Sequence, residues 1–319
     1  MALEKNEEVY ILNRGNKPLP HPDAISIVGD INDENLVAKA IDKHHFDVVV
    51  NFIAFNATDI ERDYRLFHHK TKQYIFISSA SAYQKPLTFP FVTESTPLKN
   101  PFWDYSRDKI AAEETLNQFY RNNDFPITII RPSLTYDTVI PVALGSWDDY
   151  TIVQRMKEGK EVIVHGDGTS LWTITHSNDF AKGFVGLLGH QQAIGHAFHI
   201  TSDELLTWDQ IYEAVGQAAG VKPNIVHIPS DFIAKVAKKF GQEWLVGNFL
   251  GDKSTSAIFD NSKIKSFVPD FKATIPFNKG IRKTIEWFEA KPERMVINEF
   301  WNDTIDAILN EYNQTFKSL

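Results

Sequence analysis

A tyrosine and a lysine in this chain are spaced so that they can act together on a proton. Residues 105–109 read Tyr-Ser-Arg-Asp-Lys, and in a helix Tyr105 and Lys109 (i, i+4) lie on one face. An ammonium close to a phenol favours the phenolate and lowers the pKa of the tyrosine. Tyr105 is therefore a candidate general acid and base for a carbonyl or hydroxyl group. The alternative is a pair of surface neighbours without a chemical role.

Ser79 is the second candidate for chemistry. It lies in the segment Ser-Ser-Ala-Ser-Ala-Tyr (78–83), directly after the apolar run 74–77. Ligands of open α/β sheets bind at the carboxyl ends of the strands. Tyr105 follows Ser79 by 26 residues, which is enough for a loop and a return to the same crevice. The Ser79 hydroxyl could then hold the substrate oxygen that Tyr105 protonates or deprotonates. The alternative is a serine that only caps a turn.

The elements that must position these residues alternate between strands and helices. We expect strands at 9–12, 24–28, 46–53, 74–77 and 127–130, and helices at 33–43, 57–70 and from about Tyr105 onward. This alternation is typical of βαβ units and a parallel sheet. The predicted fold class is α/β, a Rossmann-like doubly wound parallel sheet with a smaller C-terminal region that covers the substrate.

The alternation loosens after about residue 133. We expect a core over 1–160, a mixed substrate-binding region over 161–290 that is interleaved with it, and an amphipathic C-terminal helix within 291–319. That helix would dock on the body of the protein or on a partner subunit. Thr207 is a plausible helix N-cap. Trp147, Trp172 and Tyr136 are candidates for a pocket wall, and core packing explains them equally well.

Composition narrows the classes of function. The 319 residues carry a net charge of −8 and include no cysteine, so we expect no nucleic-acid partner, no disulfides and no thiolate catalysis. No run approaches the roughly 20 apolar residues of a membrane span, and residues 1–8 lack the apolar region of a signal peptide. We therefore predict a cytoplasmic protein without a membrane partner. No set of histidine and acidic residues has a recognised ligand spacing, so we expect no metal site.

Several motifs together are similar to a known family. They are Phe-Ile-Ser-Ser-Ala-Ser-Ala-Tyr (76–83), Tyr-Ser-Arg-Asp-Lys (105–109), Ile-Arg-Pro (130–132), Gly-Asp-Gly-Thr (166–169), Thr-His-Ser-Asn-Asp-Phe-Ala (175–181) and Asp-Asn-Ser-Lys (260–263). In this combination the chain resembles the extended short-chain dehydrogenase/reductases, and more narrowly the NAD-dependent epimerase/dehydratase group. The likeness covers roughly residues 5–290.

The resemblance implies roles for individual residues. Ser79, Tyr105 and Lys109 would be the catalytic residues, and Tyr105 and Lys109 would also contact the cofactor, Lys109 through the nicotinamide ribose. The other implied cofactor-binding residues are Asn13, Arg14, Asp30, Ile31, Phe52, Ile53, Ala54 and Pro132. Asn13 and Arg14 follow the strand whose end meets the adenosine ribose. An arginine there suits the 2′-phosphate of NADP better than NAD, so we lean towards NADP.

Two departures from the family pattern matter. The family opens with a strand and a glycine-rich turn that hold the pyrophosphate, and this sequence begins inside what would be the next helix. We expect that the natural start lies upstream of Met1; if not, cofactor binding should be weak. Dehydratases of the family also place an acidic pair directly after the catalytic hydroxyl. Ala80 and Ser81 stand there instead, which disfavours dehydration.

The leading hypothesis is an NAD(P)-dependent oxidoreductase or epimerase that acts on a hydroxyl or keto carbon, with a nucleotide sugar as the candidate substrate. A homodimer is expected because family members often pair through the tyrosine-bearing helix. One alternative is a non-catalytic NAD(P)- or RNA-binding relative, similar to the chloroplast stem-loop-binding proteins. Another is an inactive, truncated paralogue. The sequence does not identify the substrate.

Overall fold

A computed structural model describes the backbone of residues 1–317 and the side chains of residues 1–315. The main sheet contains four strands, in the order β11 (His196–Phe198), β6 (Ile127–Ile130), β4 (Tyr74–Ile77) and β3 (Val49–Asn51). All three pairings in this sheet are parallel. The expected α/β fold with a parallel sheet is therefore confirmed, and β4 and β6 begin and end where the sequence predicts.

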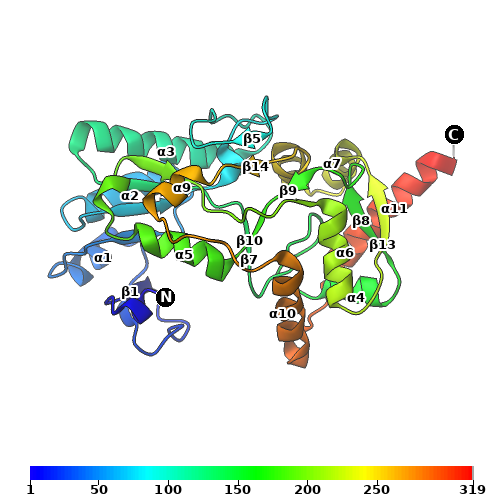
Figure 1. Cartoon of the computed structure of the whole chain (residues 1–319), viewed down its shortest axis with the longest axis horizontal. Coiled ribbons are helices and arrows are strands. Elements are labelled where there is room, and N and C mark those ends of the chain that lie inside the picture. Colours follow the sequence, from blue (N-terminus) through cyan, green and yellow to red (C-terminus); the bar gives the residue numbers. More distant parts are fainter. Residues whose placement is uncertain (318–319) are drawn as a thin grey trace.

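Both faces of this sheet are covered by helices, as Figure 1 shows. Tyr74 and Phe76 of β4 pack into a core with α2 (Ala57–Phe67) and α3 (Asp104–Asn123). Ile75 and Ile77 point the other way, into a core with the helices α5 (Ser177–Leu187) and α9 (Ser262–Phe267). Because every residue of β4 is buried, the strand is continuously apolar rather than alternating.

The helix ends follow from local chemistry. The Asn56 side chain accepts a hydrogen bond from the backbone of Asp59 and begins α2. Thr207 and Gln210 form a reciprocal capping box at the start of α6 (Trp208–Ala218), which confirms the predicted N-cap. The long helix α3 ends at Asp124, whose φ of 54° is left-handed. The Asp33 side chain accepts a hydrogen bond from the backbone of Leu36 and caps α1 (Glu34–Ala40).

The first two strands do not join the main sheet. β1 (Tyr10–Asn13) and β2 (Ile25–Val28) form a separate parallel pair. Within residues 1–317, β1 pairs only with β2, and β3 pairs only with β4. The break between β1 and β3 falls where the family pattern has its opening strand. The expected strand 46–53 is wrong in length: with one neighbour only, β3 keeps three residues, and Phe52 and Ile53 become exposed.

A second lobe has a core of its own (Figure 1). It contains the parallel strands β8 (Glu161–His165) and β13 (Asn224–Ile228). Its helices are α4 (Thr151–Lys157), α6, α7 (Ser230–Lys239), α8 (Glu243–Asn248), α10 (Phe277–Glu289) and α11 (Glu299–Lys317). Trp301, Ile305 and Ile308 of α11 are buried in this core, so the C-terminal helix docks on its own chain. The predicted division at residues 160 and 290 stays a prediction.

Short strand pairs connect the two lobes. They are β7 (Leu134–Tyr136) with β10 (Ile174–His176), β9 (Leu171–Trp172) with β12 (Leu206–Thr207), and β5 (Phe91–Val92) with β14 (Ile258–Phe259). Gly280 lets α10 approach β7, because a Cβ there would collide with the Tyr136 hydroxyl. None of the helices in residues 1–317 is both long and apolar enough to cross a membrane.

A buried ion pair ties α3 to two strands of the sheet. The Arg131 guanidinium, just after β6, lies 2.6 Å from a Glu113 carboxylate oxygen of α3, and the two side chains are 6% and 1% exposed. A second guanidinium nitrogen donates to the same carboxylate at 2.9 Å. Ser78, just after β4, donates its hydroxyl to Glu113 at 2.5 Å. The carboxylate is therefore satisfied from three directions, as a buried charge must be.

This pair yields the first prediction. Arg131→Met leaves the Glu113 charge buried without its partner and should lower the free energy of unfolding by about 3–5 kcal/mol in urea denaturation. The control is Arg65→Met, which breaks an Arg65–Glu34 pair with the same 2.6 Å separation but with side chains 53% and 38% exposed. That change should cost less than about 1 kcal/mol. Equal losses of unfolding free energy in the two variants would contradict the interpretation that the Arg131–Glu113 pair is buried.

Candidate active site

Ser79 and Tyr105 meet at the carboxyl end of the main sheet. Ser79 follows β4, and Tyr105 lies in the first turn of α3. Both side chains line one cavity, and the Ser79 hydroxyl is close enough to affect the pKa of Tyr105, so the structure brings together the two hydroxyls that the sequence analysis paired. Ser79 also caps the short 3-10 helix 80–82 by accepting from the backbone of Ser81 at 3.2 Å. Ser79 therefore does cap a turn, and this does not exclude that its hydroxyl also holds a substrate oxygen.

The expected effect on the Tyr105 pKa is wrong in direction. Burial raises the pKa of Tyr105 above its ordinary value, the neighbouring Ser79 hydroxyl opposes this rise, and the charge of Asp252 adds to it. The Lys109 ammonium lies 5.8 Å from the centroid of the Tyr105 ring. It points past the ring to backbone acceptors, so in this structure desolvation of the phenol outweighs any help from the lysine.

Lys109 is buried at the base of the site, 2% exposed. Its ammonium donates to the backbone oxygen of Ala54 at 2.7 Å and to that of Ile77 at 2.9 Å. These contacts join the ends of β3 and β4 to α3. Burial lowers the pKa of Lys109 to about 8, although the charges of Asp59 and Glu113 partly oppose the change.

The turn after β3 presents three of the predicted cofactor-binding residues. The Asn51 side-chain oxygen accepts from the backbone of Ile53 at 2.7 Å and of Ala54 at 2.8 Å. Its amide nitrogen donates to the buried carboxylate of Asp63, which anchors the turn to α2. Ala54 is buried, whereas Phe52 and Ile53 are 58% and 59% exposed. The turn therefore offers an apolar surface beside Lys109.

The remaining predicted cofactor residues lie at the ends of β1, β2 and β6. Asn13 ends β1 and bonds to Ser26 at 3.1 Å, and the Arg14 that follows is exposed. Asp30 and Ile31 follow β2, where the Asp30 carboxylate caps the next turn. These four residues are separated from Ser79 by the break in the sheet. Pro132 lies closer, in the cavity that holds Ser79 and Tyr105.

That cavity has a volume of 220 Å³ and lies between the lobes. Besides Ser79, Tyr105 and Pro132 it is lined by Ala80, Ser81, Lys85, Trp103, Ser133, Leu134, Trp147, Trp172, Asn248, Asp252, Lys253, Ala257 and Phe259. Of the three candidates for a pocket wall, Trp147 and Trp172 line this cavity, and Trp172 also belongs to the buried core. Tyr136 is buried against Phe277 instead, as the core-packing alternative predicts. Sequence reasoning missed Lys85, Asp252 and Lys253, since no motif surrounds them.

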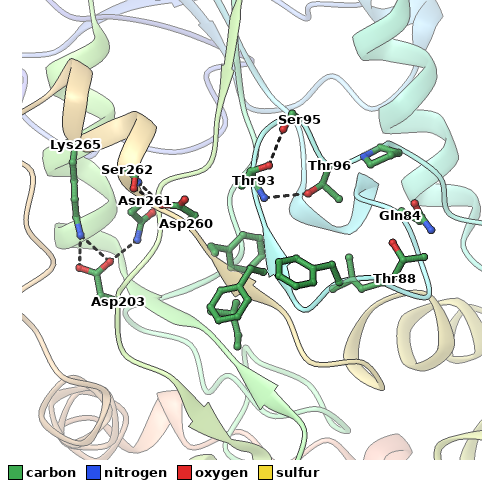
Figure 2. Close-up of a pocket in the computed structure, with 16 residues that line it drawn as sticks. Gln84, Thr88, Thr93, Ser95, Thr96, Asp203, Asp260, Asn261, Ser262 and Lys265 are labelled. Atoms are coloured by element: carbon green, nitrogen blue, oxygen red, sulfur yellow. Dashed lines mark hydrogen bonds and ion pairs between the residues drawn. The ribbon is translucent and has the colours of Figure 1, made fainter.

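A larger cavity of 760 Å³ lies on the other side of Phe259. Figure 2 shows Lys265, Asp203 and Asp260 on one side of it and Thr93 and Thr96 on the other. The Lys265 ammonium pairs with Asp203 at 2.8 Å. Exposed phenylalanines, Phe89 and Phe91, contribute to its lining. None of the predicted catalytic residues lines this cavity, so the smaller one is the candidate active site.

Comparison with known proteins gives one family and several distant relatives. The model of the NAD-dependent epimerase/dehydratase family matches residues 1–201. A 2′-dehydrokanamycin reductase of Streptomyces kanamyceticus is 23% identical over 83% of this chain and 73% of its own length. The chloroplast stem-loop binding protein of 41 kDa b of Arabidopsis thaliana is 26% identical over 73% of this chain, which spans 62% of that protein.

A solved structure shows the same fold. The dTDP-glucose 4,6-dehydratase of Bacillus anthracis, in complex with NAD, superposes with a TM-score of 0.70. The alignment covers 92% of both chains at 19% sequence identity. At this identity the likeness establishes the architecture.

The environment of Lys109 yields the second prediction. Its pKa of about 8 in the folded protein lies below the ordinary lysine value of about 10.4. Between these values the unfolded chain binds more protons, so the free energy of unfolding gains a term that rises with pH. Below pH 8 Lys109 is charged in both states, and the desolvation of its charge lowers the free energy of unfolding by its full amount. In Lys109→Met this term disappears, and unfolding in urea from pH 7.5 to 9.5 should show a smaller increase with pH than in the wild type.

The control for this measurement is Lys235→Met, because the Lys235 side chain is 81% exposed. Its pH profile should match that of the wild type. A Lys109→Met profile parallel to both would show that the ammonium is not desolvated.

Proposed function

Because the chain belongs to the NAD-dependent epimerase/dehydratase family, we propose that it is an NAD-dependent oxidoreductase or epimerase acting on a hydroxyl or keto carbon. The presence of Ser79 and Tyr105 in the lining of one cavity is the observation that carries this proposal. A nucleotide sugar is the proposed substrate class, and the dTDP-glucose named for the similar Bacillus anthracis enzyme supports it.

The residues near Tyr105 fit the nicotinamide end of such a cofactor. Lys109 lies under the site, and Pro132 lines the cavity. The exposed faces of Phe52 and Ile53 form an apolar surface that a bound ligand would cover. Among the described residues, no strand of the main sheet is followed by a glycine-rich turn that could hold the pyrophosphate. The residues of this chain therefore fit the nicotinamide end of the cofactor, and the pyrophosphate has no corresponding turn in the main sheet.

The lean towards NADP is not supported. The family description names NAD, and the similar Bacillus anthracis structure contains NAD. Arg14 is exposed after β1, where it can be solvated without any role in a phosphate site. We propose NAD as the cofactor.

In the proposed reaction the chain's own residues handle the proton. NAD, when bound, supplies the site that accepts or returns a hydride. The Tyr105 phenolate takes the proton of the substrate O–H as the carbon is oxidised, and the resulting hydroxyl gives it back on reduction. Ser79 donates a hydrogen bond to the same oxygen. The positive charge of the Lys109 ammonium, 5.8 Å from the centroid of the Tyr105 ring, stabilises the phenolate once a substrate is in place. An epimerase performs both directions in turn, with no net oxidation.

Dehydration is not part of the proposal. It requires an acid next to the catalytic hydroxyl in the family pattern, and Ala80 and Ser81 occupy those positions and line the cavity. Ser81 is buried, and its hydroxyl bonds to those of Ser79 and Ser106 at 2.9 and 2.8 Å. Neither Ala80 nor Ser81 has a carboxylic acid that could protonate a leaving hydroxyl.

Tyr105→Phe provides the third prediction. It removes the hydroxyl that moves the proton and should reduce turnover of dTDP-glucose or UDP-glucose by about a hundredfold or more. NAD affinity in calorimetric titration should change little, because the ring and Lys109 remain. Turnover can be followed by NMR of the sugar.

The control is Tyr120→Phe, the same substitution in the same helix. Tyr120 lies about 22 Å along the α3 axis at 1.5 Å per residue and should leave turnover unchanged. Wild-type turnover in Tyr105→Phe would refute the mechanism, and tighter binding of NADP than of NAD would refute the choice of cofactor.

A second candidate function is RNA binding, favoured by the similarity to the chloroplast stem-loop binding protein. The net charge of −8 opposes it. We predict that a stem-loop RNA is not retained by the immobilised protein at 50 mM salt. Retention that falls steeply between 50 and about 200 mM salt would show the electrostatic signature of nucleic-acid binding and would favour this alternative.

A further inference from the structure

Two buried lysines line the candidate active site from different parts of the chain. Lys85 follows the 3-10 helix after β4, and Lys253 ends the π-helical turn Phe249–Lys253. Each is 3% exposed. Lys85 donates to the backbone oxygen of Asp252 at 3.3 Å, and Lys253 lies 3.4 Å from the Asp252 carboxylate. Both contacts are longer than the 2.7–2.9 Å typical of charge-assisted hydrogen bonds.

Other buried cations in this protein are better compensated. Lys109 has two carbonyl oxygens within 2.9 Å, and Arg131 binds both carboxylate oxygens of Glu113, at 2.9 and 2.6 Å. Lys85 and Lys253 instead share a single acidic residue. Aromatic rings complete their surroundings, with Lys85 5.6 Å from the Trp172 ring centroid and Lys253 5.9 Å from that of Trp147. A buried charge without full compensation is unfavourable to the fold, and such groups are candidates for function.

The wall of the cavity is rich in hydrogen-bond donors. Among the described residues that line it, the acidic and basic side chains are those of Lys85, Lys253 and Asp252. The Trp172 indole nitrogen is buried and has no hydrogen-bond partner among the described residues. A ligand that supplies acceptors and negative charge would compensate both lysines.

We propose that Lys85 and Lys253 bind an oxyanion of the substrate, a carboxylate or a phosphate, in the cavity that contains Ser79 and Tyr105. The inference rests on the proposed function, since it assigns the substrate of that same site. At 220 Å³ the cavity is smaller than the 300–1,000 Å³ of sites for drug-sized ligands. It accommodates one part of a nucleotide sugar, so the oxyanion lies on the reacting sugar or on the phosphate next to it.

Calorimetric titration of the full chain with UDP-glucuronate, UDP-glucose and uridine tests this proposal. The two sugars differ in one carboxylate, and uridine has neither carboxylate nor phosphate. The wild type should bind the charged probes and not uridine. Lys85→Met and Lys253→Met should each weaken binding by about tenfold or more. If only the preference for UDP-glucuronate disappears, the oxyanion is the carboxylate; equal losses for both sugars identify the phosphate.

The matched control is Lys265→Met, in the neighbouring larger cavity, which should bind as the wild type does. Asp252→Asn removes the competing carboxylate and should tighten binding of the charged probe several-fold, an effect that damage to the fold would not produce. The melting temperatures of the two methionine variants should be unchanged or raised, because an uncompensated buried charge is lost.

Wild-type affinity in both methionine variants would overturn the proposal, as would weaker binding by Asp252→Asn. Binding of uridine as tight as that of UDP-glucose would also overturn it. Because none of these measurements uses NAD or turnover, their failure is distinct from failure of the proposed reaction, which Tyr105→Phe tests.

Discussion

The buried Glu113–Arg131 pair is the interaction on which the candidate site depends most. Glu113 belongs to the same helix as Tyr105 and Lys109, Arg131 ends β6, and Ser78 beside Ser79 completes the contact. The ion pair therefore fixes the position of the helix relative to two strand ends, because separating the two charges inside the protein would be strongly destabilising. The network continues from Arg131 over the ring of Tyr83, whose hydroxyl bonds to His199 at 3.0 Å. The residues that follow β4, β6 and β11 are thus connected, through Arg131 and Tyr83, to the single Glu113 carboxylate of α3.

The site itself forms where the two lobes meet. The sheet contributes Ser79 and Pro132, α3 contributes Tyr105, and the second lobe contributes Trp147, Trp172 and Lys253. Close backbone approach makes this possible, since a Cβ at Gly247 would collide with the Trp103 ring that walls the cavity. The shape of this cavity therefore depends on how the lobes pack, whereas the placement of the Ser79 and Tyr105 hydroxyls depends on the sheet and α3. This separation is consistent with relatives that share the fold and carry names of different activities.

The lysines of the site have three distinct environments, and these suggest different tasks. Lys109 is held by two backbone oxygens and positions the ends of β3 and β4 against α3. Lys85 and Lys253 are as deeply buried but lie beside one shared carboxylate and aromatic rings. All three are buried, and Lys109 has two backbone oxygens within 2.9 Å in place of water. The contacts of Lys85 and Lys253 with Asp252 are longer, at 3.3 and 3.4 Å, which is why we propose an oxyanion as their partner.

The sequence by itself determined the elements whose signals are local. The apolar run 74–77, the cap at Thr207 and the i, i+4 spacing of Tyr105 and Lys109 each depend on neighbours within a turn or a strand, so they could be predicted. Only the tertiary structure decided the trimming of β3 after one-sided pairing, the raised pKa of Tyr105 and the meeting of Lys85 with Asp252, 167 residues apart. These features arise from burial and from long-range packing, and no local pattern of residue types encodes either.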